Sequence, residues 1–214
     1  DDIDPDLLDI HAHDECVLPV NPTPRSHAGI GLIRRIVKPG IAVYNRTLDI
    51  NEIKHRIENY YKPYHQHLEN LINENHYRFG QVWHINCHSM PQERNIVRAL
   101  SHSARQLLPD FVLGDRDGTS CSLDFTHTLR DFLRGKGYRV AINNPYRGVE
   151  LVRRYSSPST GRHSLQIEIN KGLYWNELKH EKTSNYNRLK RDIDDLIHHC
   201  ANYVSARLSN IAAD

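Results

Sequence analysis

Apolar positions recur along this chain with two periods, one typical of strands and one typical of helices. Continuous or alternating apolar runs of strand length occur at residues 82–86, 111–113, 138–142 and 165–169. Helical spacing occurs over residues 51–75 and 94–108, in the segment that carries Leu129, Phe132 and Leu133, and over residues 184–208. Strands that alternate with helices predict an α/β fold with a largely parallel sheet.

The first 50 residues have a less regular pattern. Prolines interrupt them repeatedly, and only residues 30–37 and 41–44 form short β-prone runs. Pro63 lies inside the first helical segment, where we expect it to start a new helix or kink the existing one. Because no linker, repeat or low-complexity tract is visible, we predict a single domain over residues 1–214.

Composition and charge narrow the class of protein. The 214 residues are 38% hydrophobic and 25% charged, with a formal net charge of +2. A charge so near zero does not favour a nucleic-acid or membrane-surface partner, and no run is apolar enough for a membrane span. The four cysteines form no CxxC pair, so we expect reduced thiols and a cytoplasmic setting.

His88 ends an apolar, strand-like run and is followed at once by the turn-forming Ser89-Met90-Pro91. Open α/β sheets place their sites at the carboxyl ends of strands, where an imidazole can act as a metal ligand or general base. The alternative is a structural histidine that caps the turn. The choice depends on whether later segments converge on the same edge.

Glu168 is the second candidate, because it alternates with apolar neighbours and shares a strand face with Gln166. A carboxylate there can serve as a general base, or it can be a salt-bridged residue on a half-exposed strand. The loops at 114–118 and 144–148 present arginines, and more follow at residues 153–163. Arginines suit recognition of carboxylates, although a solvated basic surface is the simpler interpretation.

Upstream, His11 and His13 are followed by Asp14, a pattern that resembles the HxH metal ligands of barrel amidohydrolases. The pattern occurs by chance, and a barrel needs a longer chain.

In order along the chain, several segments together resemble the N-formylglutamate amidohydrolase family. They are Tyr44-Asn45-Arg46, Tyr61-Lys62-Pro63-Tyr64-His65, Cys87-His88-Ser89-Met90-Pro91, Gly114-Asp115-Arg116 with Ser120-Cys121, Asn144-Pro145-Tyr146-Arg147-Gly148, and residues 161–169 continuing into Leu173-Tyr174-Trp175-Asn176-Glu177. The resemblance implies a three-layer α/β/α sandwich of the phosphorylase/hydrolase type, akin to zinc carboxypeptidases.

The resemblance also implies a zinc-dependent hydrolase whose type reaction releases formate from N-formyl-L-glutamate, a carboxylate-bearing small molecule, in histidine degradation. Carried over by position, His88 is a zinc ligand and Glu168 the general base. Asp14 is the carboxylate ligand, with Asp9 as the competing choice. The substrate-binding residues implied in the same way are Arg46, Arg116, Arg147, Arg162 and His163.

The chain departs from the family pattern at three places. It has no Pro-His-(Ser/Ala)-Gly turn, the end of the family's N-terminal strand, so we expect either that the sequence is cut short there or that this member lacks that zinc ligand. Asn86 stands where the family usually has Asp, and Gly148-Val149 replaces its Gly-Gly. These departures support an alternative hypothesis, a non-catalytic family member that binds a small carboxylate without a complete metal site.

Overall fold

The computed structural model describes residues 23–37, 40–92 and 109–211 of the chain. Its contacts divide the chain into two compact units, residues 1–68 and 69–214. The boundary falls within helix α3 (Lys62–Phe79). Since a compact unit need not fold alone, the single domain predicted from the sequence stays a prediction. None of the described helices has the length and apolar character that crossing a membrane requires.

The first unit is built from short elements around a small core. Helix α1 (Pro24–His27) is followed by the antiparallel pair β1 (Ile36–Val37) and β2 (Ile41–Ala42), which are shorter than the predicted β-prone runs. Helix α2 (Ile50–Arg56) then packs its apolar side inward. The buried core residues of this unit are Ile33, Leu48, Ile53 and Ile57.

Pro63 lies at the second position of α3, and the helix changes its winding just before it. The chain passes from α2 through a π-helical turn, η2 (Ile57–Tyr61), directly into α3. Proline has no N–H to donate, and its ring collides with the carbonyl four residues earlier in a regular α-helix. A wider turn relieves that collision, so the predicted disturbance at Pro63 takes the form of a π-turn.

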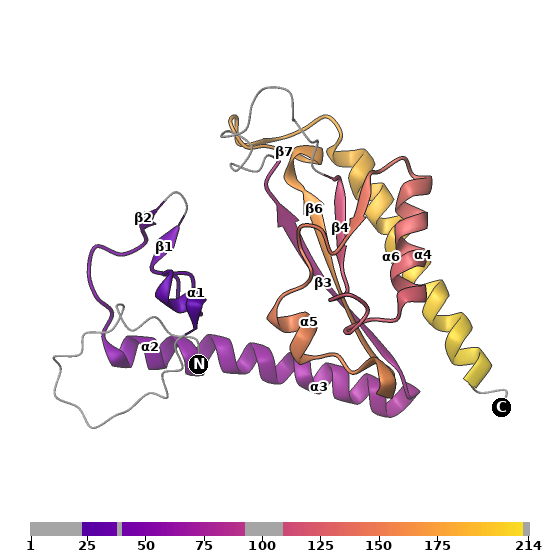
Figure 1. Ribbon diagram of the computed structural model, residues 1–214, viewed down its shortest axis with the longest axis horizontal. Coiled ribbons are helices and arrows are strands. Elements are labelled where there is room, and N and C mark those ends of the chain that lie inside the picture. Colours follow the sequence, from indigo (N-terminus) through magenta and orange to yellow (C-terminus); the bar gives the residue numbers. More distant parts are fainter. Residues whose placement is uncertain (1–22, 38–39, 93–108, 212–214) are drawn as a thin grey trace. The chain divides into compact units, whose positions relative to one another are not determined.

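The second unit contains a four-stranded sheet in the order β3-β6-β4-β5 (Figure 1). Its strands are β3 (Val82–Met90), β4 (Phe111–Gly114), β5 (Val140–Ile142) and β6 (Arg162–Asn170). β3 runs parallel to β6 and β4 runs parallel to β5, whereas β4 and β6 are antiparallel. The mostly parallel mixed sheet expected from the sequence is therefore confirmed.

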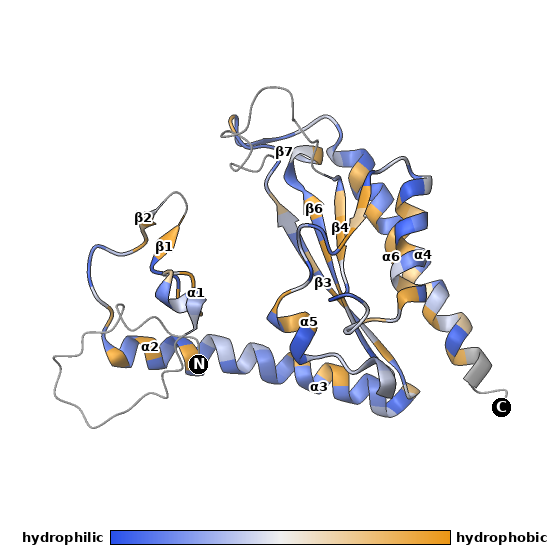
Figure 2. Ribbon diagram, viewed as in Figure 1, coloured by the Kyte–Doolittle hydropathy of each residue, from blue (hydrophilic) through white to orange (hydrophobic). Residues whose placement is uncertain are grey.

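Helices cover both faces of this sheet and complete three layers. α4 (Leu123–Gly135) and α6 (Tyr186–Ile211) lie on one side, and the short α5 (Glu150–Arg154) lies against β6 on the other (Figure 1). β4 is hydrophobic along its length, while α4 and α6 alternate between hydrophobic and hydrophilic residues (Figure 2). The main core, which includes Phe111, Leu129 and Leu165, lies between the sheet and these two helices.

Two segments differ from the expectations. β3 continues past His88 to Met90, because Ser89 and Met90 pair with the end of β6 and Met90 is buried. The long polar loop predicted over residues 143–163 contains α5 and a 3-10 turn, η4 (Pro158–Thr160). A second 3-10 turn, η5 (Lys171–Leu173), precedes a small antiparallel pair, β7 (Trp175–Asn176) and β8 (Glu181–Lys182). The helix predicted over residues 94–108 lies outside the described residues.

Candidate functional site

One face of the β3–β6 pair carries a row of polar side chains. The parallel register sets His84 opposite Ser164, Asn86 opposite Gln166 and His88 opposite Glu168. Paired residues of adjacent strands project to the same face, and alternation keeps each set of three together. The intervening residues, including Ile85, Leu165 and Ile167, belong to the core beneath α4 and α6. The polar row therefore faces away from those helices.

His88 and Glu168 form the chemical centre of this row. His88 Nδ1 lies 3.8 Å from Glu168 Oε1, and the side chains are 38% and 7% exposed, respectively. Burial raises the pKa of the Glu168 carboxyl, while His88 and a hydrogen bond from Gln166 act in the opposite direction. A carboxylate with a raised pKa beside an accessible imidazole is an arrangement suited to proton transfer.

Gln166 connects this pair to a neighbouring loop. Its side chain is 1% exposed and uses both ends of its amide. Nε2 donates to Glu168 Oε1 at 2.9 Å, and Oε1 accepts from the backbone N–H of Val149 at 3.1 Å. A buried amide with both groups satisfied is held in one orientation.

The loops that follow β4 and β5 are joined by a set of contacts that we call the loop clasp, comprising residues 115–118 and 143–149. Asp115 N–H donates to Asn143 Oδ1, and Asn143 Nδ2 donates back to Asp115 Oδ1. Arg116 N–H donates to the Arg147 carbonyl at 2.9 Å. Gly114 precedes the clasp, and a Cβ there would lie 2.7 Å from the Gly148 nitrogen. The two loops can approach so closely only because residue 114 has no side chain.

The clasp presents two of the predicted arginines, Arg116 and Arg147. Arg116 has a left-handed backbone, with φ of 54°, and its guanidinium donates to the Gly148 carbonyl at 3.1 Å. Arg147 forms an ion pair with Asp117, and both side chains are more than half exposed. Because the clasp also supplies the Val149 N–H, the structure links these two arginines to Gln166 and Glu168.

The structure does not bring Arg162 and His163 to Glu168. Arg162 opens β6 and donates to Asn73 Oδ1 at 2.7 Å, six residues before Glu168 and so roughly 20 Å along the strand. His163 lies on the opposite face of the sheet, stacked on Trp83 with ring centroids 5.1 Å apart. Burial there lowers the pKa of its imidazole.

The remaining predicted residues lie elsewhere. Arg46 belongs to the first unit, where its guanidinium pairs with Glu52 at 2.9 Å. Asp14 and the competing Asp9 lie outside the described residues. Within the ranges that the structure covers, no group of three His, Cys, Asp or Glu side chains is placed to hold a metal ion. His88 and Glu168 are two such donors, whereas a catalytic zinc takes three protein ligands.

Sequence reasoning missed two residues of this face, Gln166 as a connector and Asn86 as an unsatisfied donor. Asn86 is 9% exposed, and its Nδ2 has no hydrogen-bond partner in the described part of the chain. The signal for both was present in the alternation of β3 and β6. What the alternation could not show is which strands pair, and therefore which side chains meet.

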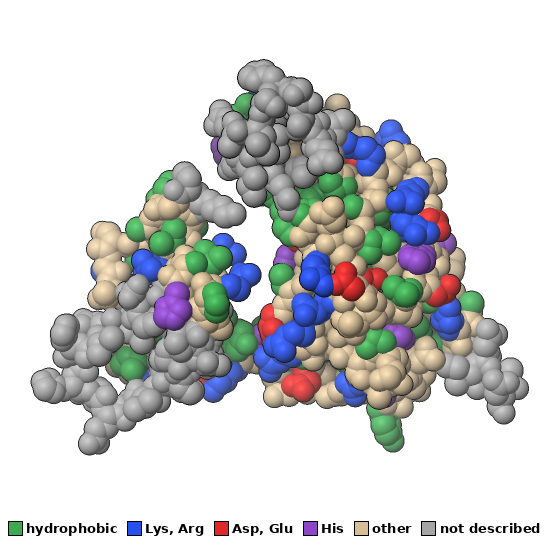
Figure 3. Space-filling model, viewed as in Figure 1, with side chains coloured by type: hydrophobic (Ala, Val, Ile, Leu, Met, Phe, Trp, Pro, Cys, Tyr) green, Lys and Arg blue, Asp and Glu red, His purple; other side chains and the backbone are tan. Residues whose placement is uncertain are grey.

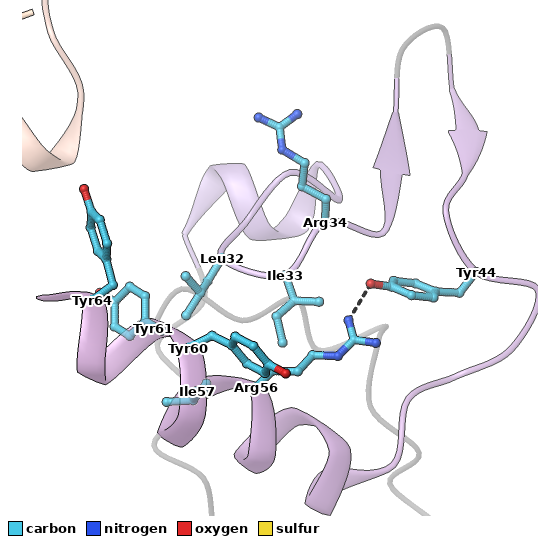
Figure 4. Close-up of a pocket in the computed structure, with 9 residues that line it drawn as sticks. All are labelled: Leu32, Ile33, Arg34, Tyr44, Arg56, Ile57, Tyr60, Tyr61 and Tyr64. Atoms are coloured by element: carbon cyan, nitrogen blue, oxygen red, sulfur yellow. Dashed lines mark hydrogen bonds between the residues drawn. The ribbon is translucent and has the colours of Figure 1, made fainter. Parts of the chain in front are cut away.

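The first unit contains a separate pocket of about 600 Å³ (Figure 4). Four tyrosines and two arginines line it, with apolar side chains such as Leu32 and Ile57. Its Arg56 guanidinium donates to the Tyr44 hydroxyl at 2.6 Å and also pairs with Glu52. None of the predicted site residues lines this pocket.

The charged surface of the second unit is mixed. Lys and Arg side chains are interspersed with Asp and Glu side chains on the face shown in Figure 3.

Comparison with known proteins adds independent findings. The family model for N-formylglutamate amidohydrolase matches residues 2–175. A crystal structure of N-formylglutamate amidohydrolase from Ralstonia eutropha JMP134 superposes with a TM-score of 0.84 at 40% sequence identity. The match covers 96% of this chain and 71% of that one. None of the curated proteins matches the chain.

Proposed function

The chain belongs to the N-formylglutamate amidohydrolase family, and on that basis we propose that it hydrolyses the amide bond of an N-acyl amino acid. The preferred substrate is N-formyl-L-glutamate, which gives formate and glutamate. The observation that carries the proposal beyond family membership is the His88–Glu168 pair, formed on neighbouring strands of one sheet face.

Glu168 is the general base of the proposed reaction. It accepts a proton from water as the water oxygen bonds to the formyl carbon, and it returns the proton to the amide nitrogen as the C–N bond breaks. A base works best when its pKa lies near the operating pH, and burial moves the pKa of Glu168 upward from its ordinary value. The imidazole of His88 lies beside this carboxylate, with Nδ1 3.8 Å from Oε1.

Arg116 and Arg147 are the proposed anchors for the two substrate carboxylates, because they lie on the loop clasp next to Gln166. Among the described residues, the Arg147 guanidinium has one ion pair, with the exposed Asp117, and such a pair contributes little and is easily exchanged for a substrate carboxylate. For Arg46, a role in substrate binding is proposed from the family resemblance. Arg162 and His163 have other partners, and we do not assign them a carboxylate.

We propose zinc as the metal, with His88 as one ligand and Asp14 as another. Zinc, when bound, lowers the pKa of a water and polarises a carbonyl. His88 fits the role of a ligand, because its side chain is 38% exposed and its ring faces a carboxylate. The described residues do not complete the ligand set, and the proposed proton transfers involve Glu168 alone.

The test begins with metal content and formate release. Purified protein should contain zinc, release formate from N-formyl-L-glutamate, and lose this activity in chelator until zinc is restored. Glu168→Gln should retain the metal and lower turnover by roughly 10²–10⁴-fold. Glu181→Gln, which changes an exposed carboxylate of the same unit, should keep the wild-type rate.

Two results would contradict the proposal. Near-normal turnover in Glu168→Gln would remove Glu168 from the chemistry. Zinc-loaded protein that binds glutamate-like carboxylates but releases no formate would favour the non-catalytic alternative.

A further inference from the structure

We propose that Gln166 is a positioning residue that transmits the geometry of the loop clasp to the Glu168 carboxylate and leaves Oε2 as the oxygen that meets the reacting water. This inference rests on the proposed function of Glu168. The structural basis is a continuous path of hydrogen bonds from Val149 through Gln166 to Glu168.

This path engages one carboxylate oxygen of Glu168 in a hydrogen bond and leaves the other oxygen available. Gln166 Nε2 donates to Oε1 at 2.9 Å, and Oε1 is also the oxygen that lies 3.8 Å from His88 Nδ1. None of the hydrogen bonds within the described ranges uses Oε2. The terminal torsion of glutamate is broad, so a carboxylate without such a bond can set its plane at a range of angles. The Gln166 bond removes this freedom.

Gln166 is itself fixed at its other end. The Val149 N–H reaches Gln166 Oε1 at 3.1 Å, so the amide can present only its NH₂ to Glu168. Val149 keeps this place because it is the last residue of the clasp and directly follows Gly148, whose carbonyl accepts from Arg116. The side chain of Val149 is not needed for the path, since that residue is 42% exposed and contributes its backbone.

If Gln166 had a purely structural role, its replacement should affect the protein in the same way as replacement of another buried polar residue on this strand face. Ser164 lies two residues earlier on the same strand face, is fully buried, and hydrogen bonds to His84 at 2.8 Å. If Gln166 only stabilised the strand, removing the polar group of either residue would have similar consequences. If Gln166 positions Glu168, only its own replacement should change turnover.

The first experiment compares Gln166→Met, which keeps the length of the side chain, with the matched control Ser164→Ala. We expect Gln166→Met to lower kcat by about tenfold or more, since the bond it removes has a charged partner. KM should stay near the wild-type value, because the side-chain hydrogen bonds of Gln166 within the described residues go to Glu168 and Val149 and not to the arginines that bind substrate. Ser164→Ala should keep kcat. Unchanged kcat in Gln166→Met, or equal losses in both variants, would overturn the inference.

A second pair of variants works from the loop and does not depend on the folding of a core substitution. Val149→Pro removes the N–H that orients Gln166, and the φ of −100° at this position must shift by about 20° to reach the proline range. Val149→Ala keeps the N–H. We expect kcat to fall by roughly threefold or more in Val149→Pro, since one neutral hydrogen bond is lost, and to be unchanged in Val149→Ala. Equal rates in the two variants would contradict the path.

The last measurements separate this inference from the proposed function. In the Glu168→Gln background, adding Gln166→Met should cause no further loss of turnover, because its target is already gone. If Glu168→Gln abolishes turnover and Gln166→Met does not, the inference alone fails. If wild-type protein has no activity, crystal structures still decide: the Glu168 carboxylate plane should be ordered with one oxygen hydrogen-bonded to Gln166 Nε2 in wild type, and should be rotated or disordered in Gln166→Met. An unchanged orientation would overturn the inference.

Discussion

At the scale of single residues, the site depends on a buried carboxylate, Glu168, and an exposed guanidinium, Arg147. Glu168 is buried, and burial favours its protonated form. Arg147 is exposed and forms an ion pair with Asp117, another exposed side chain. The first residue is suited to exchanging a proton, and the second is suited to exchanging its partner for a ligand.

Replacement of Glu168 should reveal the cost of burying its charge. The raised pKa lies above the ordinary value of 4.5, so the stabilising contribution of this group is present below pH 4.5 and is lost as pH rises through the raised pKa. Glutamine does not titrate. In chelator, Glu168→Gln should therefore melt at a higher temperature than wild type at pH 7.5, with a smaller difference at pH 4.5. Equal differences at both pH values would contradict the raised pKa.

Replacement of Arg147 should weaken substrate binding more than turnover. Arg147→Ala should raise KM for N-formyl-L-glutamate by roughly 10–100-fold, the loss expected for a hydrogen bond between charged groups. Steady-state kinetics measures this, with Arg153→Ala as the control, because Arg153 is equally exposed and pairs with Glu150. A matching rise in KM in both variants would indicate a general effect of positive charge.

At the scale of elements, the strand register and the loop clasp place the chemistry. The parallel register of β3 and β6 sets His88 beside Glu168, and a slip of one residue would move every polar side chain of one strand into the core. The clasp fixes the loops that follow β4 and β5 relative to each other. These loops are closest beside Gly114, where the backbone of Arg147 and Gly148 occupies the space that a side chain would need.

A methyl group at Gly114 should therefore separate the two loops. Gly114→Ala should destabilise the protein by about 1–3 kcal/mol, as expected when a packed region is overfilled, and should lower turnover by displacing Val149. Gly135→Ala is the control, since that glycine ends α4 and has open space around its Cβ position. The control should be neutral or slightly stabilising. Denaturant unfolding and formate release would measure both variants, and an unaffected Gly114→Ala would show that the clasp tolerates separation.

At the scale of the whole molecule, the second unit has the larger core, and the site is built on its sheet. α4 and α6 bury one face of that sheet, so the opposite face is left for polar side chains. The first unit has its own small core and its own pocket. The stability that supports the site therefore comes mainly from the packing beneath it.

A cavity in this core should reduce stability without altering the chemistry. Leu129 is fully buried in α4, and Leu129→Ala should lower the free energy of unfolding by about 2–5 kcal/mol. Leu123 begins the same helix and is 55% exposed, so Leu123→Ala should cost far less. Urea unfolding would compare them, and kcat of the folded Leu129→Ala protein should stay near that of wild type. A large change in kcat would show that the core also tunes the site.

Local pattern accounts for most of what the sequence predicted correctly. The apolar periods located β4, β5, β6, α4 and α6 within a few residues, and alternation assigned Gln166 and Glu168 to one face. The missed features depend on distant partners. β3 runs on to Met90 only because β6 pairs with it, and α5 forms in a stretch whose own pattern is polar.

The sequence by itself determined the main strands and helices of the second unit, the family and the residues with suitable chemistry, because helical and strand periods and ordered motifs are properties of neighbouring positions. Only the tertiary structure decided which of those residues meet. It paired His88 with Glu168, set His163 on the opposite face and made Gln166 the link to the clasp. Those contacts join segments far apart in the chain, and their register follows from packing that involves both partners at once.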